Sequence, residues 1–368
     1  MLLCLILSGC GPGVPSGPSP TWTPDADPTP TETSRVAFTP SPVGSTPTAQ
    51  PEVAFPPGLR DADSGVFYVE SDGAILRVDL KARRVQRTFT PRLERFRNFV
   101  ATRHLLVVKQ IWDGVGFVVT KDGDVRELPN ELGGTGRLYA GGRDAIWVVP
   151  EEPSGAQRTI LLFSTATGEP KLLERRNVPA TLGIPGPDGA GNLLADEPSL
   201  PYVVTRSSTK RLPGWRRGGE MLGIGATSIL VKPCPRCAVT QHNRRASDKK
   251  RRATARGLKG VDKLLATYDY GADGELSPSG RYMAMSVTMN NEARDFRLAV
   301  TDLTTGKTLL MPGTTTQFNA NDQSVWLSKS SDRWLLAVTD QTLRILDTTT
   351  GTVHTWGGVT AGRVAVVG

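Results

Sequence analysis

The sequence is poor in the residues that build metal sites and nucleophilic sites: its 368 residues include only three His and four Cys. It has no run of 18 apolar residues, so no segment is expected to cross a membrane as a helix. It also lacks the Gly-x-Ser-x-Gly, His-Glu-x-x-His and Gly-rich phosphate-loop motifs that mark common enzyme classes. We therefore expect no cofactor, and an enzyme is the less favoured class.

Proline is abundant but unevenly placed. Of 28 Pro, 13 fall between Gly11 and Pro57, and 15 remain for the 311 residues from Gly58 onward. This predicts three parts: a head (1–10), a disordered Pro/Thr/Ser-rich tether (11–58) and one body (59–368). The tether has one Arg against four acidic residues, a net charge of −3, so the chain's total of +8 leaves +11 on the body.

The head is short and apolar and ends in Leu7-Ser8-Gly9-Cys10. This ending resembles the lipobox of bacterial lipoproteins, in which a small residue precedes a Cys that receives a lipid. The resemblance implies a signal peptide ending at Cys10 and an anchor on the outer face of the bacterial cytoplasmic membrane. No Lys or Arg precedes the apolar stretch, which we attribute to a start codon placed too far downstream. The alternative is a chance apolar terminus with an unmodified Cys10.

The body reads as strands, because β-rich runs of five to eight residues recur between Gly, Asp, Asn and Pro and no helical apolar stripe is convincing. Tight turns are centred near residues 82, 122, 167, 208, 246, 305 and 350, in steps of 38 to 45 residues apart from one of 59. Such steps are typical of four-stranded propeller blades. We predict an all-β, seven-bladed β-propeller with an insertion near Val261 to Gly274. The run Arg363–Val367 should pair with the first blade and close the ring.

Two segments carry a family resemblance. Leu276-Ser277-Pro278-Ser279-Gly280-Arg281-Tyr282-Met283-Ala284-Met285 resembles the FSPDGRYLA element of TolB-type and WD-repeat-like propeller blades, and Trp326 to Ala337 is a looser copy. The resemblance implies a turn that leads into a strand with alternate apolar residues. It implies a fold and no particular function, because propellers include binding proteins, scaffolds and enzymes.

Cys234 and Cys237 flank Pro235 and Arg236 between two apolar runs. A β-turn here brings the two Cα atoms within the distance that a disulfide requires, and such a small loop stabilises a hairpin by about 2 kcal/mol. Two other interpretations stay open. One is a redox dithiol, which needs a helix or βαβ context that is not evident. The other is a zinc site with His242 as a third ligand.

A run of basic residues follows this hairpin, opposed only by Asp248. It predicts an anion-binding patch for acidic wall polymers or lipid headgroups. The alternative is a solvated edge strand whose charges prevent pairing. Nucleic acid is not expected as a partner, because no aromatic residue interleaves the run. The residues of this basic run are Arg244, Arg245, Lys249, Lys250, Arg251, Arg252 and Arg256.

The remaining polar candidates favour structural roles. His104, His242 and His354 are expected at strand edges, and the Asp61/Asp63 and Asp122/Asp124 pairs suit turns better than calcium sites. The tryptophans Trp112, Trp147, Trp215, Trp326, Trp334 and Trp356 should mostly fill the core between blades.

These observations predict a monomeric, lipid-anchored, extracytoplasmic propeller that binds a protein or an acidic polymer at the cell surface. The alternative is a propeller enzyme, a lyase or a quinoprotein-like oxidoreductase, with its site in the central channel.

Overall fold

The chain forms two units, Met1–Thr46 and Pro47–Gly368. The computed structural model describes residues 53–62, 64–91, 93, 97–111, 113–151, 155–197, 200–211, 220–234, 236–244, 258–270, 274–288, 296–314 and 324–367, all in the second unit. Among these residues, no helix has the length and apolar character needed to span a membrane. The predicted lipidation site Cys10 and the tether up to Glu52 lie outside the described residues.

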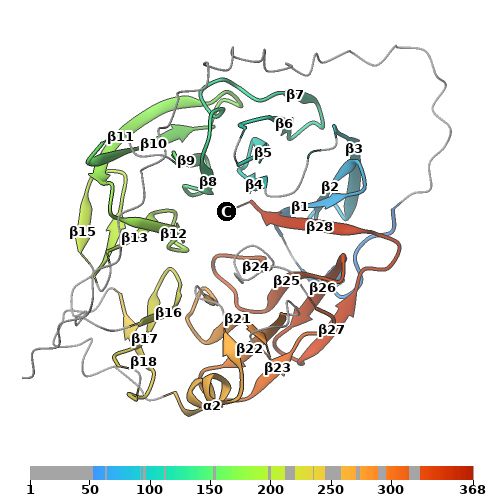
Figure 1. Cartoon of the computed structure of the whole chain (residues 1–368). Helices are drawn as coiled ribbons and strands as arrows, with labels where there is room; N and C mark the ends of the chain where they lie inside the picture. The colour runs from blue at the N-terminus through green and yellow to red at the C-terminus, as the bar shows by residue number, and fades with distance from the viewer. Residues whose placement is uncertain are drawn as a thin grey trace, which may run out of the picture. The chain divides into compact units, whose positions relative to one another are not determined.

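Five sheets have four antiparallel strands each and are arranged radially as propeller blades (Figure 1). The first is β28 (Ala361–Val366), β1 (Val66–Ser71), β2 (Ala74–Asp79) and β3 (Arg84–Phe89). The second is β4 (Arg97–Ala101), β5 (Leu105–Gln110), β6 (Gly116–Thr120) and β7 (Val125–Glu127), and the third is β8 (Arg137–Ala140), β9 (Ala145–Val149), β10 (Gln157–Ser164) and β11 (Lys171–Pro179). The fourth is β12 (Gly183–Pro187), β13 (Leu193–Glu197), β14 (Leu200–Val204) and β15 (Thr209–Arg211), and the fifth is β24 (Ser324–Trp326), β25 (Trp334–Thr339), β26 (Thr342–Asp347) and β27 (Thr352–Thr355).

The sixth sheet has eight strands. Its order is β18 (Thr240–Asn243), β17 (Ser228–Lys232), β16 (Glu220–Ile224), β20 (Gly274–Leu276), β21 (Tyr282–Thr288), β22 (Arg297–Asp302) and β23 (Thr308–Leu310), and β19 (Asp269–Tyr270) pairs with β21. The prediction of seven four-stranded blades is therefore wrong: the described residues form five such blades and one eight-stranded sheet.

The physical reason is a parallel pairing between β16 and β20. Gly223 and Gly274 lie opposite each other, and a Cβ built on Gly274 would meet the Leu222 carbonyl oxygen at 2.6 Å. Only glycine allows the two backbones to approach this closely. The pairing joins strands that were expected in separate blades. The spacing of turns along the sequence does not show which strands pair, so it could not predict this contact.

A substitution at Gly274 tests the role of this close approach. Gly274→Ala should lower the free energy of unfolding by about 1 to 3 kcal/mol, because the new Cβ meets backbone that cannot yield without shifting a strand. Urea unfolding measures the change. Gly357→Ala is the matched control, since Gly357 has no atom within 4 Å of an added Cβ. Equal stabilities for the two variants would contradict the account.

A single α-helix of the described part, α2 (Lys259–Thr267), precedes β19. Its buried residues Val261 and Leu264 pack with Leu222, Leu230 and Met283 in the core of the eight-stranded sheet. The structure thus has an insertion where one was predicted, but its helix was not predicted. A short 3₁₀ helix (η1, Leu59–Asp61) stands before β1.

The last strand joins the first sheet, as predicted. β28 runs antiparallel to β1, with Phe67 opposite Val366 and Val69 opposite Val364. It is the end strand of that sheet, and Figure 1 shows it beside the centre of the described unit. The N-terminal and C-terminal strands of the propeller therefore hold each other in place.

The core lies between neighbouring sheets. One cluster joins Phe67 and Leu76 of the first sheet to Leu336 and Ile345 of the fifth. The tryptophans Trp147, Trp326, Trp334 and Trp356 are all buried in such clusters. Their predicted role as core between blades is confirmed, whereas Trp112 and Trp215 lie outside the described residues.

Candidate binding face

The turns that follow β4, β8, β12, β16, β20 and β24 contact one another around the propeller. The Arg103 N–H donates to the Arg143 carbonyl oxygen at 2.9 Å, and the Thr227 hydroxyl donates to the Pro278 carbonyl oxygen at 3.1 Å. The first contact joins the turn after β4 to the turn after β8, and the second joins the turn after β16 to the turn after β20. We call this set of turns the turn belt.

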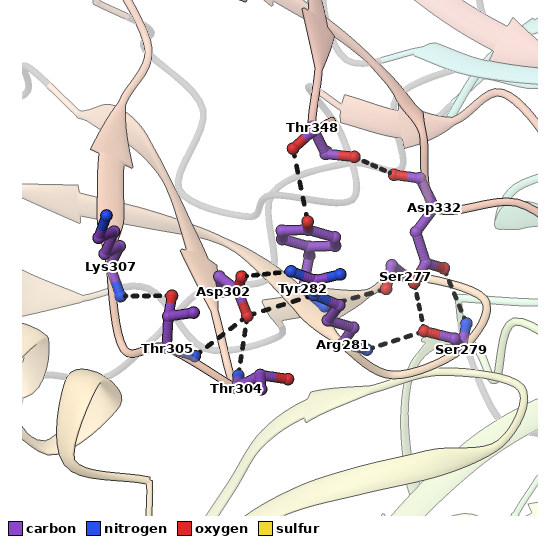
Figure 2. A network of polar contacts seen from close by, with 10 residues as sticks. All are labelled: Ser277, Ser279, Arg281, Tyr282, Asp302, Thr304, Thr305, Lys307, Asp332 and Thr348. Atoms are coloured by element: carbon purple, nitrogen blue, oxygen red, sulfur yellow. Dashed lines mark hydrogen bonds and ion pairs between the residues drawn. The ribbon is translucent and has the colours of Figure 1, made fainter. Parts of the chain in front are cut away.

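Figure 2 shows the part of the turn belt formed by the segment that resembles TolB-type propellers. The Ser279 N–H donates to the Asp332 carboxylate at 2.9 Å, and the Ser279 hydroxyl donates to the same group. The Arg281 guanidinium pairs with Asp302 at 2.9 Å and lies over the Tyr282 ring. The Ser-Pro-Ser-Gly-Arg segment thus forms the turn that was predicted and links β20 to the turn after β24.

The pattern repeats in the fifth sheet, whose sequence is the looser copy. Arg333 pairs with Asp347 at 3.1 Å and lies over the Trp334 ring at 4.5 Å from its centroid. Hydrogen bonds with arginine keep the pKa values of the Asp302 and Asp347 carboxyls below the ordinary value, although partial burial opposes this shift. Both acids also accept backbone N–H bonds from the turn that follows. These groups stabilise turns.

Asp188 and Arg244 form the most buried ion pair of the turn belt. Asp188 is completely buried, and the Arg244 side chain is 10% exposed. The guanidinium Nη2 lies 2.5 Å from the carboxylate Oδ2, and Nη1 donates to the Asp188 and Gly225 carbonyl oxygens at 2.9 and 2.8 Å. The backbone N–H groups of Ala190 and Asn192 satisfy the other carboxylate oxygen. This pair holds the turn after β12 to the strand end of β18.

Arg244 is therefore not the exposed anion-binding residue that its place in the basic run suggested. Its charge is committed to Asp188, 56 residues earlier in the chain. The other six residues of the run, Arg245, Lys249, Lys250, Arg251, Arg252 and Arg256, lie outside the described residues. Their predicted role in binding anions stays a prediction.

The two cysteines are at disulfide distance, as predicted. Their sulfur atoms lie 2.17 Å apart and their Cα atoms 5.0 Å apart, and the Cys237 N–H donates to the Cys234 carbonyl oxygen at 3.0 Å. The turn joins the antiparallel strands β17 and β18. His242, the third ligand of the zinc interpretation, has its Nε2 atom 2.9 Å from the Thr240 hydroxyl. Within the described ranges, no three His, Cys, Asp or Glu side chains are grouped so that they could hold a metal ion.

The other histidine and aspartate candidates contact structural groups. His104 lies 3.7 Å from the Asp144 carboxylate, which also faces Arg103. The His354 ring packs against Gly58. Asp61 is 4.0 Å from Arg333, and Asp63 lies outside the described residues. Asp122 and Asp124 flank Gly123, whose φ of +97° places it in a tight turn. The turn interpretation of these residues fits the structure.

Two ionisable residues in strands escaped the sequence analysis. Lys109 in β5 is completely buried, and its Nζ has no hydrogen-bond partner among the described residues. Burial lowers the pKa of Lys109 to about 8, and the negative charge of Asp113 raises it by a smaller amount. Glu275 in β20 has a buried Oε2 without a partner in that same part of the chain. Burial raises the pKa of Glu275 to about 8, although the backbone N–H of Trp326 donates a hydrogen bond to its carboxyl. The burial of Lys109 could have been predicted from the sequence, because this lysine follows four apolar residues in the same strand.

Removing the buried charge of Lys109 should stabilise the propeller. The native ammonium loses its proton near pH 8 and the unfolded one near pH 10.5, so below pH 8 the native state carries the full cost of burying the charge. Lys109→Met should raise the free energy of unfolding by about 2 to 3 kcal/mol at pH 7, and the gain should shrink toward pH 10.5. Denaturant unfolding at several pH values measures it. The exposed control Lys121→Met should change little, and a destabilised Lys109→Met at pH 7 would sink the prediction.

No protein-family model matches the chain, and the search of curated proteins found no match. Among solved structures, a protein of unknown function from Desulfotomaculum acetoxidans is 11% identical, with a TM-score of 0.44 over 82% of this chain and 99% of that one. The β-propeller domain of the trilobed protease from Pyrococcus furiosus is 11% identical, with a TM-score of 0.43 over 77% and 84% of the two chains. A periplasmic gluconolactonase from Pseudomonas aeruginosa is 12% identical, with a TM-score of 0.42 over 82% and 97%. These likenesses do not indicate what this chain binds.

Proposed function

We propose that this chain is a lipid-anchored, extracytoplasmic β-propeller that binds an acidic polymer at the bacterial cell surface through its basic run. The observation that carries the proposal is where the run leaves and rejoins the propeller. Arg244 is fixed to Asp188, and Leu258 is buried with its N–H bonded to the Val239 carbonyl oxygen at 3.2 Å. Both anchored ends flank β18, the last strand of the eight-stranded sheet: Arg244 directly follows this strand, and Val239 directly precedes it. The 13 residues between them carry six basic side chains and one acidic one.

A rigid support makes such a run effective. The turn belt and the packed α2 keep the two ends in place, so the charge density at this edge does not depend on rearrangement of the sheet. Clustered positive charge raises the local concentration of polyanions, and the attraction falls as salt increases. The acidic polymer is favoured over a protein partner because a charge run with no interleaved aromatic residue offers no apolar anchor.

Polyphosphate and poly-L-glutamate are suitable probes of this proposal. The full chain should bind at least one of them at low ionic strength, with affinity falling as salt increases. Arg245→Gln/Lys249→Gln/Lys250→Gln/Arg251→Gln should weaken binding at least tenfold, whereas the four-residue control Arg87→Gln/Lys171→Gln/Arg175→Gln/Lys210→Gln should not. Binding of an unrelated surface protein but neither polymer would favour the protein partner and contradict the proposal.

The lipid anchor has a separate test. In cells fed labelled palmitate, the full chain should become labelled and sediment with membranes, because a diacylated Cys is a stable anchor. Cys10→Ser should abolish the label, and Cys4→Ser in the same apolar head should keep it. Label retained by Cys10→Ser would contradict the anchor.

The enzyme alternative rests on Glu275. Its raised pKa keeps a neutral carboxyl on an inner strand near neutral pH, as in some general acids. Its Oε2 is buried, so a substrate would need the strand to open. An activity that Glu275→Gln abolishes would favour this alternative.

A further inference from the structure

A cavity of about 350 Å³ lies between the disulfide turn and α2. Lys232, Arg236 and Cys237 line one side, and Asp262 and Leu265 of α2 line the other. Lys232 ends β17, and Arg236 lies inside the turn that the disulfide closes. The cavity therefore brings two basic side chains to the outer edge of the eight-stranded sheet, near Val239, where the basic run rejoins the propeller through Leu258.

Two carboxylates beside these cations, Glu220 and Asp262, accept hydrogen bonds from other groups. Glu220 lies opposite Lys232 in the β16–β17 register, and its carboxylate accepts the Tyr270 hydroxyl at 2.9 Å. Burial together with this bond raises the pKa of Tyr270 to about 12. The Asp262 Oδ1 accepts the Val239 N–H at 2.9 Å. In the described part of the chain, neither Lys232 nor Arg236 makes an ion pair.

The disulfide fixes the backbone that carries Arg236. A hydrogen bond and a covalent bond both join Cys234 to Cys237, so the backbone of Arg236 cannot rearrange without breaking the turn. Guanidinium groups bind planar or tetrahedral oxyanions with two parallel hydrogen bonds, and a neighbouring ammonium adds a point charge. With the backbone of Arg236 fixed, only side-chain rotamers have to be ordered when an anion binds.

We propose that this cavity is an oxyanion site, which binds one phosphate or carboxylate group of the acidic polymer and sets the register of the chain along the basic run. The proposal rests on the proposed function, because the polymer must reach this edge. It assigns a role to the disulfide beyond stabilising the hairpin: the disulfide keeps the Arg236 backbone at the edge of this cavity.

Calorimetric titration of the full chain tests the site with sodium tripolyphosphate, and with tetraglutamate as the carboxylate probe. Lys232→Gln/Arg236→Gln should weaken binding of the preferred probe at least tenfold. The control Lys81→Gln/Arg84→Gln removes two exposed basic residues, one from the β2–β3 turn and one from the start of β3, and should change the affinity less than twofold. Whichever probe binds more tightly to the wild type identifies the group, phosphate or carboxylate.

The disulfide supplies a second variant that keeps both charges. Cys234→Ser/Cys237→Ser should weaken binding of the same probe severalfold while circular dichroism still shows the folded sheets. Wild-type affinity in Lys232→Gln/Arg236→Gln would overturn the site. If the four-residue variant of the basic run loses polymer binding while the cavity variant keeps it, the site is wrong and the proposed function stands. If the wild type binds no probe and no polymer, the proposed function itself fails.

Discussion

Replacing Asp188 with alanine should lower the free energy of unfolding by about 3 to 5 kcal/mol, which is the usual cost of leaving one member of a buried ion pair without its partner. The carboxylate is completely buried and accepts bonds from Arg244, Ala190 and Asn192. Its loss removes the charged partner of the guanidinium and the acceptor of two turn N–H groups, those of Ala190 and Asn192. Urea unfolding of the purified chain measures the effect.

The double variant Asp188→Ala/Arg244→Met distinguishes the loss of the whole ion pair from the loss of one partner. It should be more stable than Asp188→Ala alone, because a buried pair replaced by apolar groups often costs little. A matched exposed pair, Arg126 with Glu169 at 3.1 Å, provides the comparison, and Glu169→Ala should cost at most about 1 kcal/mol. A cost below 1 kcal/mol for Asp188→Ala would show that the turn belt does not depend on this ion pair.

Replacing Glu275 with glutamine should make the chain more stable at pH 8 and leave its stability at pH 5 nearly unchanged. The native carboxyl keeps its proton up to about pH 8, whereas the unfolded one loses it near 4.5. Between these values the native state holds more protons than the unfolded state, so wild-type stability falls with pH by up to about 1.4 kcal/mol per unit. Glutamine is neutral throughout, and its advantage should reach about 3 to 5 kcal/mol above pH 8.

The measurement is the difference in unfolding free energy between wild type and Glu275→Gln at pH 5, 6, 7 and 8, since the difference cancels every other titrating group. Glu127→Gln, on an exposed position of β7, should give a flat difference over the same range. A flat difference for Glu275→Gln would mean that its carboxyl is ionised in the folded propeller.

Local patterns predicted much of this fold. The Ser-Pro-Ser-Gly-Arg turn and the Cys234–Cys237 β-turn depend on residues close in sequence, and the pairing of the last strand with β1 followed from the need to close the ring. The parallel contact of β16 with β20 depends instead on two glycines 51 positions apart. Because this contact was not evident from the sequence, separate blades were predicted for two sets of strands that form one sheet. The stripe Val261, Leu264 and Leu265 was too short to predict α2.

The residues of the candidate site were harder to predict from the sequence than the fold. Arg244 looked like part of a charge run because its partner Asp188 lies on another sheet. Lys232 and Arg236 were overlooked because only the folded hairpin places them against α2. Charge in a sequence therefore indicates where a polyanion is attracted, while the fold decides which basic side chains remain available to it.

Hydrogen exchange of the full chain with and without bound polyphosphate tests the central claim most directly. The account predicts slower exchange in peptides from residues 228 to 264, which include the disulfide turn, the basic run and the start of α2. Peptides of β5 and β6 in the second sheet should exchange at the same rate with and without polymer. Slower exchange in β4 to β7 without any change between residues 228 and 264 would contradict it.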